Sequence, residues 1–233
     1  MPTTYRLLGR TGVRVSKVCL GTWMFGTRTD QPESRLILNA ALDAGINFVD
    51  TANRYGREVV SPTVDYGGGL SEEYIGRALK DRGASARHQI VLATKVFGAM
   101  GPGPNDRGHS RVHVSAALED SLRRLQTDYV DLYYLHWPDP ETSLDEAART
   151  MDDLVRAGKI RFWATSNHPA WKVTRLHWFC DRAGLHPPVA AQPGVTCPII
   201  GPRTLEQFQD NAGALEWDLD AETATSLSAL TTP

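Results

Sequence analysis

The sequence predicts an α/β protein in which parallel strands form a single barrel, and three observations favour this fold. Apolar, strand-like runs alternate with helix-like segments along most of the chain, as in sheets whose parallel strands are joined by crossover helices. The length of 233 residues suits one barrel domain, over residues 1–233. Three of the apolar runs end on Asp50, Lys95 and His136, and catalytic side chains of a barrel gather at such carboxyl ends.

The strands are predicted from short apolar runs bounded by polar or glycine-containing segments. An open, doubly wound sheet would have the same order of elements. However, no strand leads into a G-x-G-x-x-G turn, and the glycines at 67–69 follow no convincing strand, so the barrel is favoured. The seven predicted strands are residues 17–20, 47–50, 90–95, 130–136, 160–166, 188–192 and 196–200.

Helices are predicted between these strands from apolar residues spaced three and four apart. Apolar faces run through residues 36–44, 114–125 and 144–155, and Gly45 and Gly158 follow the first and the third as stop signals. Ser71 precedes two glutamates and is predicted to cap a further helix, with the acids at its positive end.

Composition and charge exclude several classes of protein. The chain is 41% hydrophobic and carries 25 Lys and Arg against 27 Asp and Glu without a basic block, which argues against nucleic acid as a partner. The N-terminus does not resemble a signal peptide, and the apolar runs are too short to cross a bilayer. Cys19, Cys180 and Cys197 form no close pair in the sequence, which is typical of a reducing compartment and not of a zinc site. We predict a cytoplasmic protein without a metal.

Asp50, Tyr55, Lys95 and His136 together indicate a proton-donating tyrosine. A tyrosine is a poor acid because its reference pKa is near 10, and a neighbouring ammonium group favours the phenolate. Lys95 is predicted to act in this way on Tyr55, Asp50 to hold Lys95, and His136 to orient a carbonyl oxygen. Each residue alone also has a structural explanation as a cap, an ion-pair partner or a buried histidine, so the hypothesis depends on all four.

The segment Asp50-Thr-Ala-Asn-Arg-Tyr55-Gly56 resembles the D-T-A-x-x-Y-G signature of the aldo-keto reductases, in the branch of the potassium-channel β subunits and bacterial enzymes. The resemblance implies a (β/α)8 TIM barrel that reduces a small-molecule aldehyde or ketone with NADPH, in which Asp50, Tyr55, Lys95 and His136 match the catalytic four and Tyr55 is the proton donor. Further similar segments are residues 8–12, 20–23, 71–79, 122–128, 157–161 and 199–204.

The resemblance also implies residues that contact NADP(H) and the substrate. Ser166, Asn167 and Gln192 match the positions that bind the nicotinamide carboxamide. A second group matches the segment that binds the adenosine 2′-phosphate, where Thr204 is expected to open a helix with free amides and Arg203 to add a bidentate donor. This group comprises Gly201, Arg203, Thr204, Gln207 and Asn211. Gly21, Thr22 and Asp50 are also predicted at the cofactor, and Trp23 and Trp137 at the substrate pocket.

The sequence departs from the family pattern in two places. Residues 57–65 lengthen the loop after Tyr55, which places a second candidate acid, Tyr66, before the next helix. One strand and its flanking helices are missing between Gln192 and Thr196. Four residue steps span about 13 Å at full extension, whereas a crossover needs about a dozen residues or more. Three explanations remain. The protein has an internal segment that this sequence omits, the segment is truly deleted, or the chain is a decayed, non-catalytic relative.

Three functions follow from these observations as hypotheses. The first is an NADPH-dependent carbonyl reductase. The second is a module that binds NADPH but turns over poorly, as in relatives attached to ion channels. The third is an aldolase that uses Lys95 to form an imine with its substrate. The oligomeric state is left open.

Overall fold

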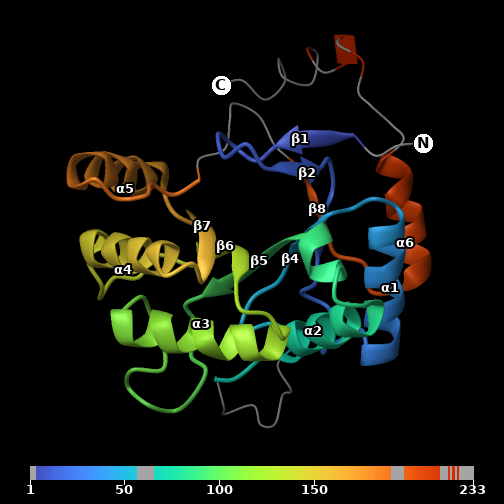
Figure 1. Cartoon of the computed structure of the whole chain (residues 1–233), viewed down its shortest axis with the longest axis horizontal. Helices are drawn as coiled ribbons and strands as arrows, with labels where there is room; N and C mark the ends of the chain where they lie inside the picture. The colour runs from blue at the N-terminus through green and yellow to red at the C-terminus, as the bar shows by residue number, and fades with distance from the viewer. Residues whose placement is uncertain are drawn as a thin grey trace.

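The computed structural model describes residues 4–56, 66–189 and 197–215, together with residues 220, 222, 223 and 225. Six parallel strands form one sheet in the order β7-β6-β5-β4-β3-β8. Helices lie in an arc on the outside of this sheet (Figure 1). The predicted α/β fold with parallel strands is therefore confirmed. The strands are β3 (Cys19–Gly21), β4 (Phe48–Asp50), β5 (Val91–Val96), β6 (Val130–Leu135), β7 (Ile160–Thr165) and β8 (Ile199–Ile200).

The helices confirm the three predicted apolar faces and add α5, which the sequence did not single out. Asp30, Ser110, Ser143 and Thr204 cap α1, α3, α4 and α6 by accepting a backbone N–H three residues later. The helices are α1 (Gln31–Asp43), α2 (Leu70–Arg82), α3 (Arg111–Leu125), α4 (Leu144–Arg156), α5 (Ala170–Ala183) and α6 (Leu205–Ala212), with short 3-10 turns at Ala86–Gln89 and Gly213–Leu215.

The prediction that Ser71 caps α2 was wrong. Gly69, at a φ of 105°, occupies the cap position, and Ser71 lies inside the first turn. The Ser71 hydroxyl is fully buried and instead meets the side chain of Thr51 at 2.9 Å and the carbonyl oxygen of Thr22 at 3.0 Å. A left-handed backbone that glycine tolerates thus moves the helix start two residues earlier and releases the serine for the interior.

An N-terminal hairpin that the sequence did not predict closes one end of the curved sheet. Its strands, β1 (Tyr5–Leu7) and β2 (Arg14–Ser16), pair antiparallel, and β1 is exposed along its length. Leu8 and Val15 pack against an interior cluster that includes Phe48 and Leu132. Figure 1 shows the hairpin at the top of the view, next to β8. Its two strands are only three residues long, too short to show the alternating apolar pattern on which strand prediction depends.

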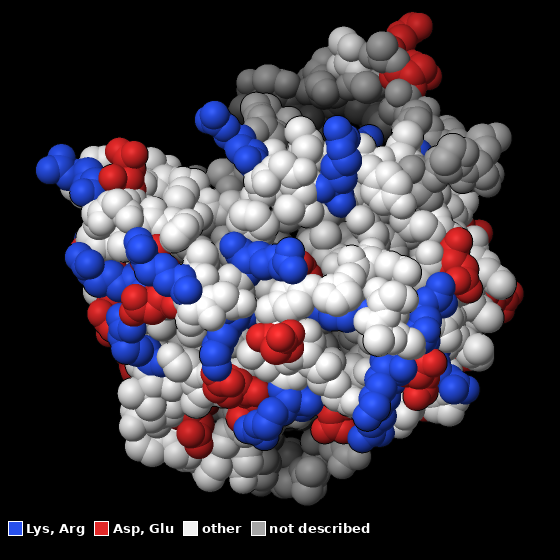
Figure 2. Space-filling model, viewed as in Figure 1, with Lys and Arg blue, Asp and Glu red and all other residues white. Residues whose placement is uncertain are grey.

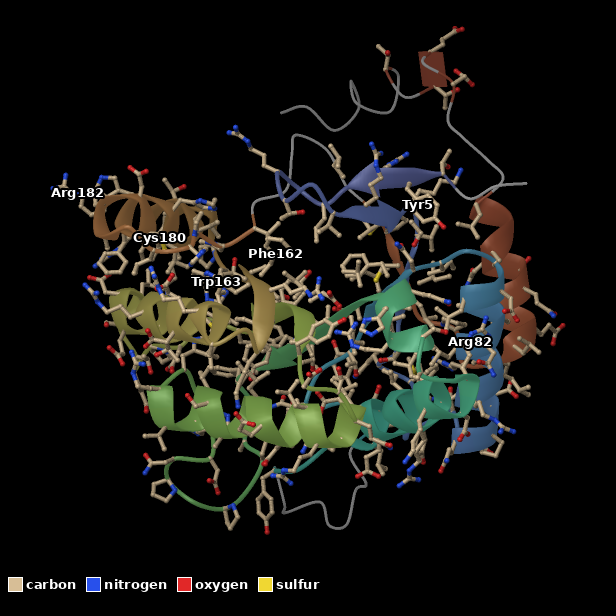
Figure 3. The ribbon with its side chains drawn as sticks, viewed as in Figure 1. Tyr5, Arg82, Phe162, Trp163, Cys180 and Arg182 are labelled. Atoms are coloured by element: carbon tan, nitrogen blue, oxygen red, sulfur yellow. The ribbon has the colours of Figure 1, made fainter. Side chains whose placement is uncertain are left out.

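The strands have two apolar faces because alternate side chains point to opposite sides of a sheet. On β7, Phe162 packs with the interior cluster, whereas Trp163 packs with the cluster beneath the helices. Figure 3 shows Trp163 near Cys180 of α5 on that outer side. The charged surface is mixed: on the face in Figure 2, acidic and basic groups lie side by side.

Within the described residues, β7 and β8 are the two edges of the sheet. The strand that the sequence lacks between Gln192 and Thr196 is expected between these two edges. Val189 continues alongside β7, because its N–H donates to the Trp163 carbonyl oxygen at 2.7 Å. A strand was predicted at residues 188–192. Residues 188 and 189 do not form one, and residues 190–192 lie outside the described residues. Of the strand predicted at 196–200, the described residues begin at 197, and among these Ile199–Ile200 form a strand.

A buried ion pair ties α2 to β5 and α3. Glu72 is fully buried, accepts a hydrogen bond from Thr94 Oγ1 at 2.6 Å and pairs with Arg124 Nε at 2.8 Å. Gly76 allows the same close approach, because a Cβ there would lie 2.3 Å from the Arg124 carbonyl oxygen. The contact therefore depends on one small residue and one buried carboxylate.

Replacing Glu72 with Gln should lower the free energy of unfolding by about 3 kcal/mol, because it leaves the mostly buried Arg124 without its counter-ion. Glu73→Gln is the matched control: Glu73 pairs with Arg77 at the surface, and its loss should cost about 0.5 kcal/mol or less. Urea unfolding of both variants checks this. Equal losses would contradict the dependence on burial.

Candidate active site

Lys95 and Asp50 form a buried ion pair where β5 and β4 end. Lys95 Nζ lies 2.5 Å from Asp50 Oδ2, and the two side chains are only 7% and 6% exposed. The same ammonium group donates to the Thr51 carbonyl oxygen at 2.8 Å and to the Tyr55 hydroxyl at 3.3 Å. These three acceptors match the three hydrogens of the ammonium group, so Lys95 has its full set of partners.

The surroundings keep Lys95 charged. Burial acts to lower the pKa of Lys95, but the Asp50 carboxylate and the Tyr55 hydroxyl outweigh it, and the pKa lies above its ordinary value. Burial likewise raises the pKa of the Asp50 carboxyl, and the Lys95 ammonium opposes that rise. A fixed positive charge therefore faces the Tyr55 hydroxyl.

Tyr55 and His136 meet above this pair. Their rings are 6.0 Å apart, edge to face, and Lys95 Nζ lies 4.8 Å from the centre of the Tyr55 ring. Burial, together with the Lys95 ammonium, lowers the pKa of His136 to about 4, so the imidazole is neutral at neutral pH. A hydroxyl next to a fixed cation and a neutral imidazole can both donate hydrogen bonds to one oxygen.

The competing tyrosine, Tyr66, has a different setting. It is exposed and borders a shallow pocket with Ala99 and Arg107, whereas the hydroxyl that contacts Lys95 is that of Tyr55. The geometry therefore places Tyr55 against the ammonium group of Lys95.

The residues expected at the nicotinamide lie around the same strand ends. Asn167 has a left-handed backbone, with a φ of 58°, and its amide donates to the His136 carbonyl oxygen at 2.9 Å and to the Ser166 hydroxyl at 3.0 Å. Gly21 lies opposite Asp50 in the sheet, and both the N–H and the hydroxyl of Thr22 donate to the Asp50 carbonyl oxygen at 3.0 Å. Gln192 lies outside the described residues.

The second predicted cofactor group lies at β8 and α6. Thr204 caps α6 and its hydroxyl accepts from Gln207 N. The Gln207 side chain accepts a hydrogen bond from Arg203 N at 2.9 Å. Gly201 lies before α6, and Asn211 lies near the end of this helix. The expected free amides are partly occupied, because Leu205 N donates to Glu33.

A pocket of about 740 Å³ opens beside His136. Trp137 lines it, together with residues of the loops that follow β5 and β6. Arg54 also lines it and donates to the Ala99 carbonyl oxygen at 2.7 Å. Trp23 is 62% exposed and does not line this pocket. Of the two residues predicted at the substrate, Trp137 therefore lines this pocket and Trp23 does not.

Sequence reasoning missed Tyr134 and one pair of cysteines. Lys95 Nζ lies 5.8 Å from the centre of the Tyr134 ring, and burial raises the pKa of Tyr134 well above its ordinary value. Its position two residues before His136 is a signal, since such residues share a face of a strand. Cys19 of β3 and Cys197, two residues before β8, are joined by a side-chain hydrogen bond although they are far apart in sequence.

Comparison with known proteins identifies the class. The profile of the aldo/keto reductase family matches residues 17–193, so the chain belongs to this family, whose fold is a (β/α)8 barrel. Family membership supports an oxidoreductase. In the described residues, no helix is long and apolar enough to cross a membrane, and no group of ligating side chains is arranged to hold a metal ion.

Two kinds of relatives are similar to the chain. A probable voltage-gated potassium channel subunit beta of Oryza sativa subsp. japonica is 40% identical over 190 residues, which cover 81% of this chain and 54% of the relative. The uncharacterized oxidoreductase YrpG of Bacillus subtilis is 42% identical over 175 residues, 73% and 51% of the two chains. The aldo-keto reductase YhdN of the same bacterium is 38% identical over 186 residues, 78% and 51%. The matched part spans about half the length of each relative.

We expect the His136 imidazole to titrate near pH 4 in the folded protein, well below the reference value near 6.5. Because folding lowers this pKa, the folded state should lose stability relative to the unfolded state as the pH falls from about 6.5 towards 4. NMR titration of the imidazole resonances checks this, with His136→Gln to assign the signal. A midpoint near 6.5 would contradict the burial of a neutral ring.

Proposed function

We propose that the chain catalyses the NADPH-dependent reduction of an aldehyde or ketone to an alcohol, with Tyr55 as the proton donor. The observation that carries this proposal is the contact of the Tyr55 hydroxyl with the buried, charged Lys95, which Asp50 holds in place. Family membership and the oxidoreductases among the relatives agree with it.

The side chains would act on the carbonyl oxygen. Tyr55 and the neutral His136 donate hydrogen bonds to this oxygen and polarise the carbonyl group. When bound, the nicotinamide supplies a hydride to the carbonyl carbon. As negative charge grows on the oxygen, Tyr55 transfers its proton to it, and the Lys95 ammonium stabilises the phenolate that remains. Asp50 keeps Lys95 charged and in position throughout.

The residues present fit the cofactor that this reaction requires. Ser166 and Asn167 place hydroxyl and amide groups beside His136, where they would hold the nicotinamide carboxamide with Gln192. Residues 201–211 would form the segment at the adenosine 2′-phosphate, with Arg203 and Thr204 at the N-terminus of α6 and Asn211 in its last turn. Gly21 and Thr22 line the sheet end between these two groups, next to Asp50.

The arrangement disfavours an aldolase. An imine-forming lysine must be a neutral nucleophile at the moment of attack. Lys95 has a raised pKa and three hydrogen-bond acceptors around its ammonium group. Its surroundings support an electrostatic role.

Tyr55→Phe should lower the turnover number about 10²- to 10⁴-fold, since it removes the general acid, while NADPH affinity is retained. Tyr66→Phe is the matched control and should keep full activity, because Tyr66 is exposed and the hydroxyl that contacts Lys95 is that of Tyr55. Carbonyl-dependent loss of NADPH absorbance measures both. Full activity in Tyr55→Phe would overturn the assignment, and loss in Tyr66→Phe alone would transfer it to Tyr66.

A second candidate, an NADPH-binding regulatory protein with little turnover, is favoured by the relatives named as potassium channel β subunits. In that case NADPH should quench the intrinsic tryptophan fluorescence with high affinity, while a broad panel of aldehydes and ketones is not reduced. Rapid turnover of any carbonyl on the panel would exclude this candidate.

A further inference from the structure

The N-terminus of α6 already binds a negative charge from the chain itself. Leu205 N–H, the first amide of the helix, donates to Glu33 Oε1 at 2.5 Å. Glu33 comes from the first turn of α1, 172 positions earlier. Two neighbouring amides are also satisfied within the chain. The Gln207 N–H donates to Thr204 Oγ1, and the Arg203 N–H donates to Gln207 Oε1.

This carboxylate lies at the place where the chain would receive the 2′-phosphate of NADPH. Amides at a helix N-terminus, with the positive end of its dipole, bind anions. Glu33 uses one of these amides and adds its own charge. A phosphate that binds at this end of α6 must therefore displace Glu33 or lie beside it, and like charges in contact are strongly unfavourable.

The adjoining pocket has mixed charge. A space of about 620 Å³ lies between the loop before α1 and the start of α6, and Arg28, Asp30, Glu33 and Arg203 all line it. Asp30 is used as the cap of α1, where it accepts from Glu33 N at 3.0 Å. Thr29 fixes the other side, since its hydroxyl donates to the Arg203 carbonyl oxygen at 2.9 Å. Glu33 and Arg203 are thus held in one pocket by contacts between α1 and α6.

We propose that Glu33 is a specificity-determining residue of the nucleotide site, and that its carboxylate lowers the preference for NADPH over NADH. A carboxylate repels a 2′-phosphate but accepts a hydrogen bond from a free ribose 2′-hydroxyl, as acidic residues do in sites for NAD. This inference rests on the proposed function, because it assumes that a nicotinamide nucleotide binds here.

The test compares nucleotide affinities in the full chain with Glu33 changed. Glu33→Gln keeps an acceptor for Leu205 N but removes the charge, so it should tighten NADPH binding about tenfold, with NADH unchanged or weaker. Fluorescence titration gives both dissociation constants without any turnover. Glu206→Gln is the matched control, since Glu206 is an exposed acid in the first turn of the same helix, and it should leave the ratio nearly unchanged.

Two additional arms separate the possible failures. Adenosine 2′,5′-bisphosphate and adenosine 5′-phosphate test the 2′-phosphate alone by calorimetry, and Glu33→Gln should tighten only the first. Glu33→Ala should shift the ratio in the same direction even if α6 is less firmly held. If NADPH and NADH bind but Glu33→Gln leaves their ratio unchanged, the role of Glu33 is overturned and the proposed function stands. If neither nucleotide binds to the wild type, the proposed function falls and this inference with it.

Discussion

The buried ion pair of Asp50 and Lys95 is the constraint on which the site depends. A single charge in such a place would cost several kcal/mol, so β4 and β5 must align with both side chains at the same end. The surrounding polar groups reinforce this alignment. Thr22 binds the Asp50 carbonyl oxygen, and the buried Ser71 joins Thr22 to Thr51. The ends of β3 and β4 and the start of α2 are therefore fixed around one ammonium group, and Tyr55 is held against it.

Local patterns predicted the strand ends well and the helix starts less well. An apolar run that stops on an ionisable residue is visible in the sequence, and Asp50, Lys95 and His136 do meet Tyr55 in space. Ser71 misled because three glycines before it adopt backbone conformations that other residues avoid, so α2 begins earlier. The strands of the hairpin β1–β2 are three residues each, too short for an apolar pattern to reveal them.

Contacts between distant segments could not be predicted from spacing. The carboxylate of Glu33 accepts a hydrogen bond from the first amide of α6. In the sequence, however, Glu33 resembles any acidic residue in the first turn of a helix. Cys19 and Cys197 meet only because β3 and the residues before β8 are neighbours in the sheet. Tyr134 is the opposite case, since the two-residue period of a strand places it on the same side as His136. Spacing reveals a neighbour within one strand, and shared strand ends reveal a group such as Asp50, Lys95 and His136, but neither reveals a contact such as that of Glu33 with Leu205.

The packing of β8 and α6 against β3 and α1 also affects how the chain folds. Thr29 pairs with Arg203 across 174 positions and Glu33 with Leu205 across 172. Contacts of such long sequence separation form slowly, because the entropy cost of closing a large loop must be met before the contacts can stabilise the chain. During synthesis, β3 and α1 leave the ribosome long before these partners exist. The side of β3 that later pairs with β8 therefore stays unpaired until then, which leaves it open to wrong strand partners in the nascent chain.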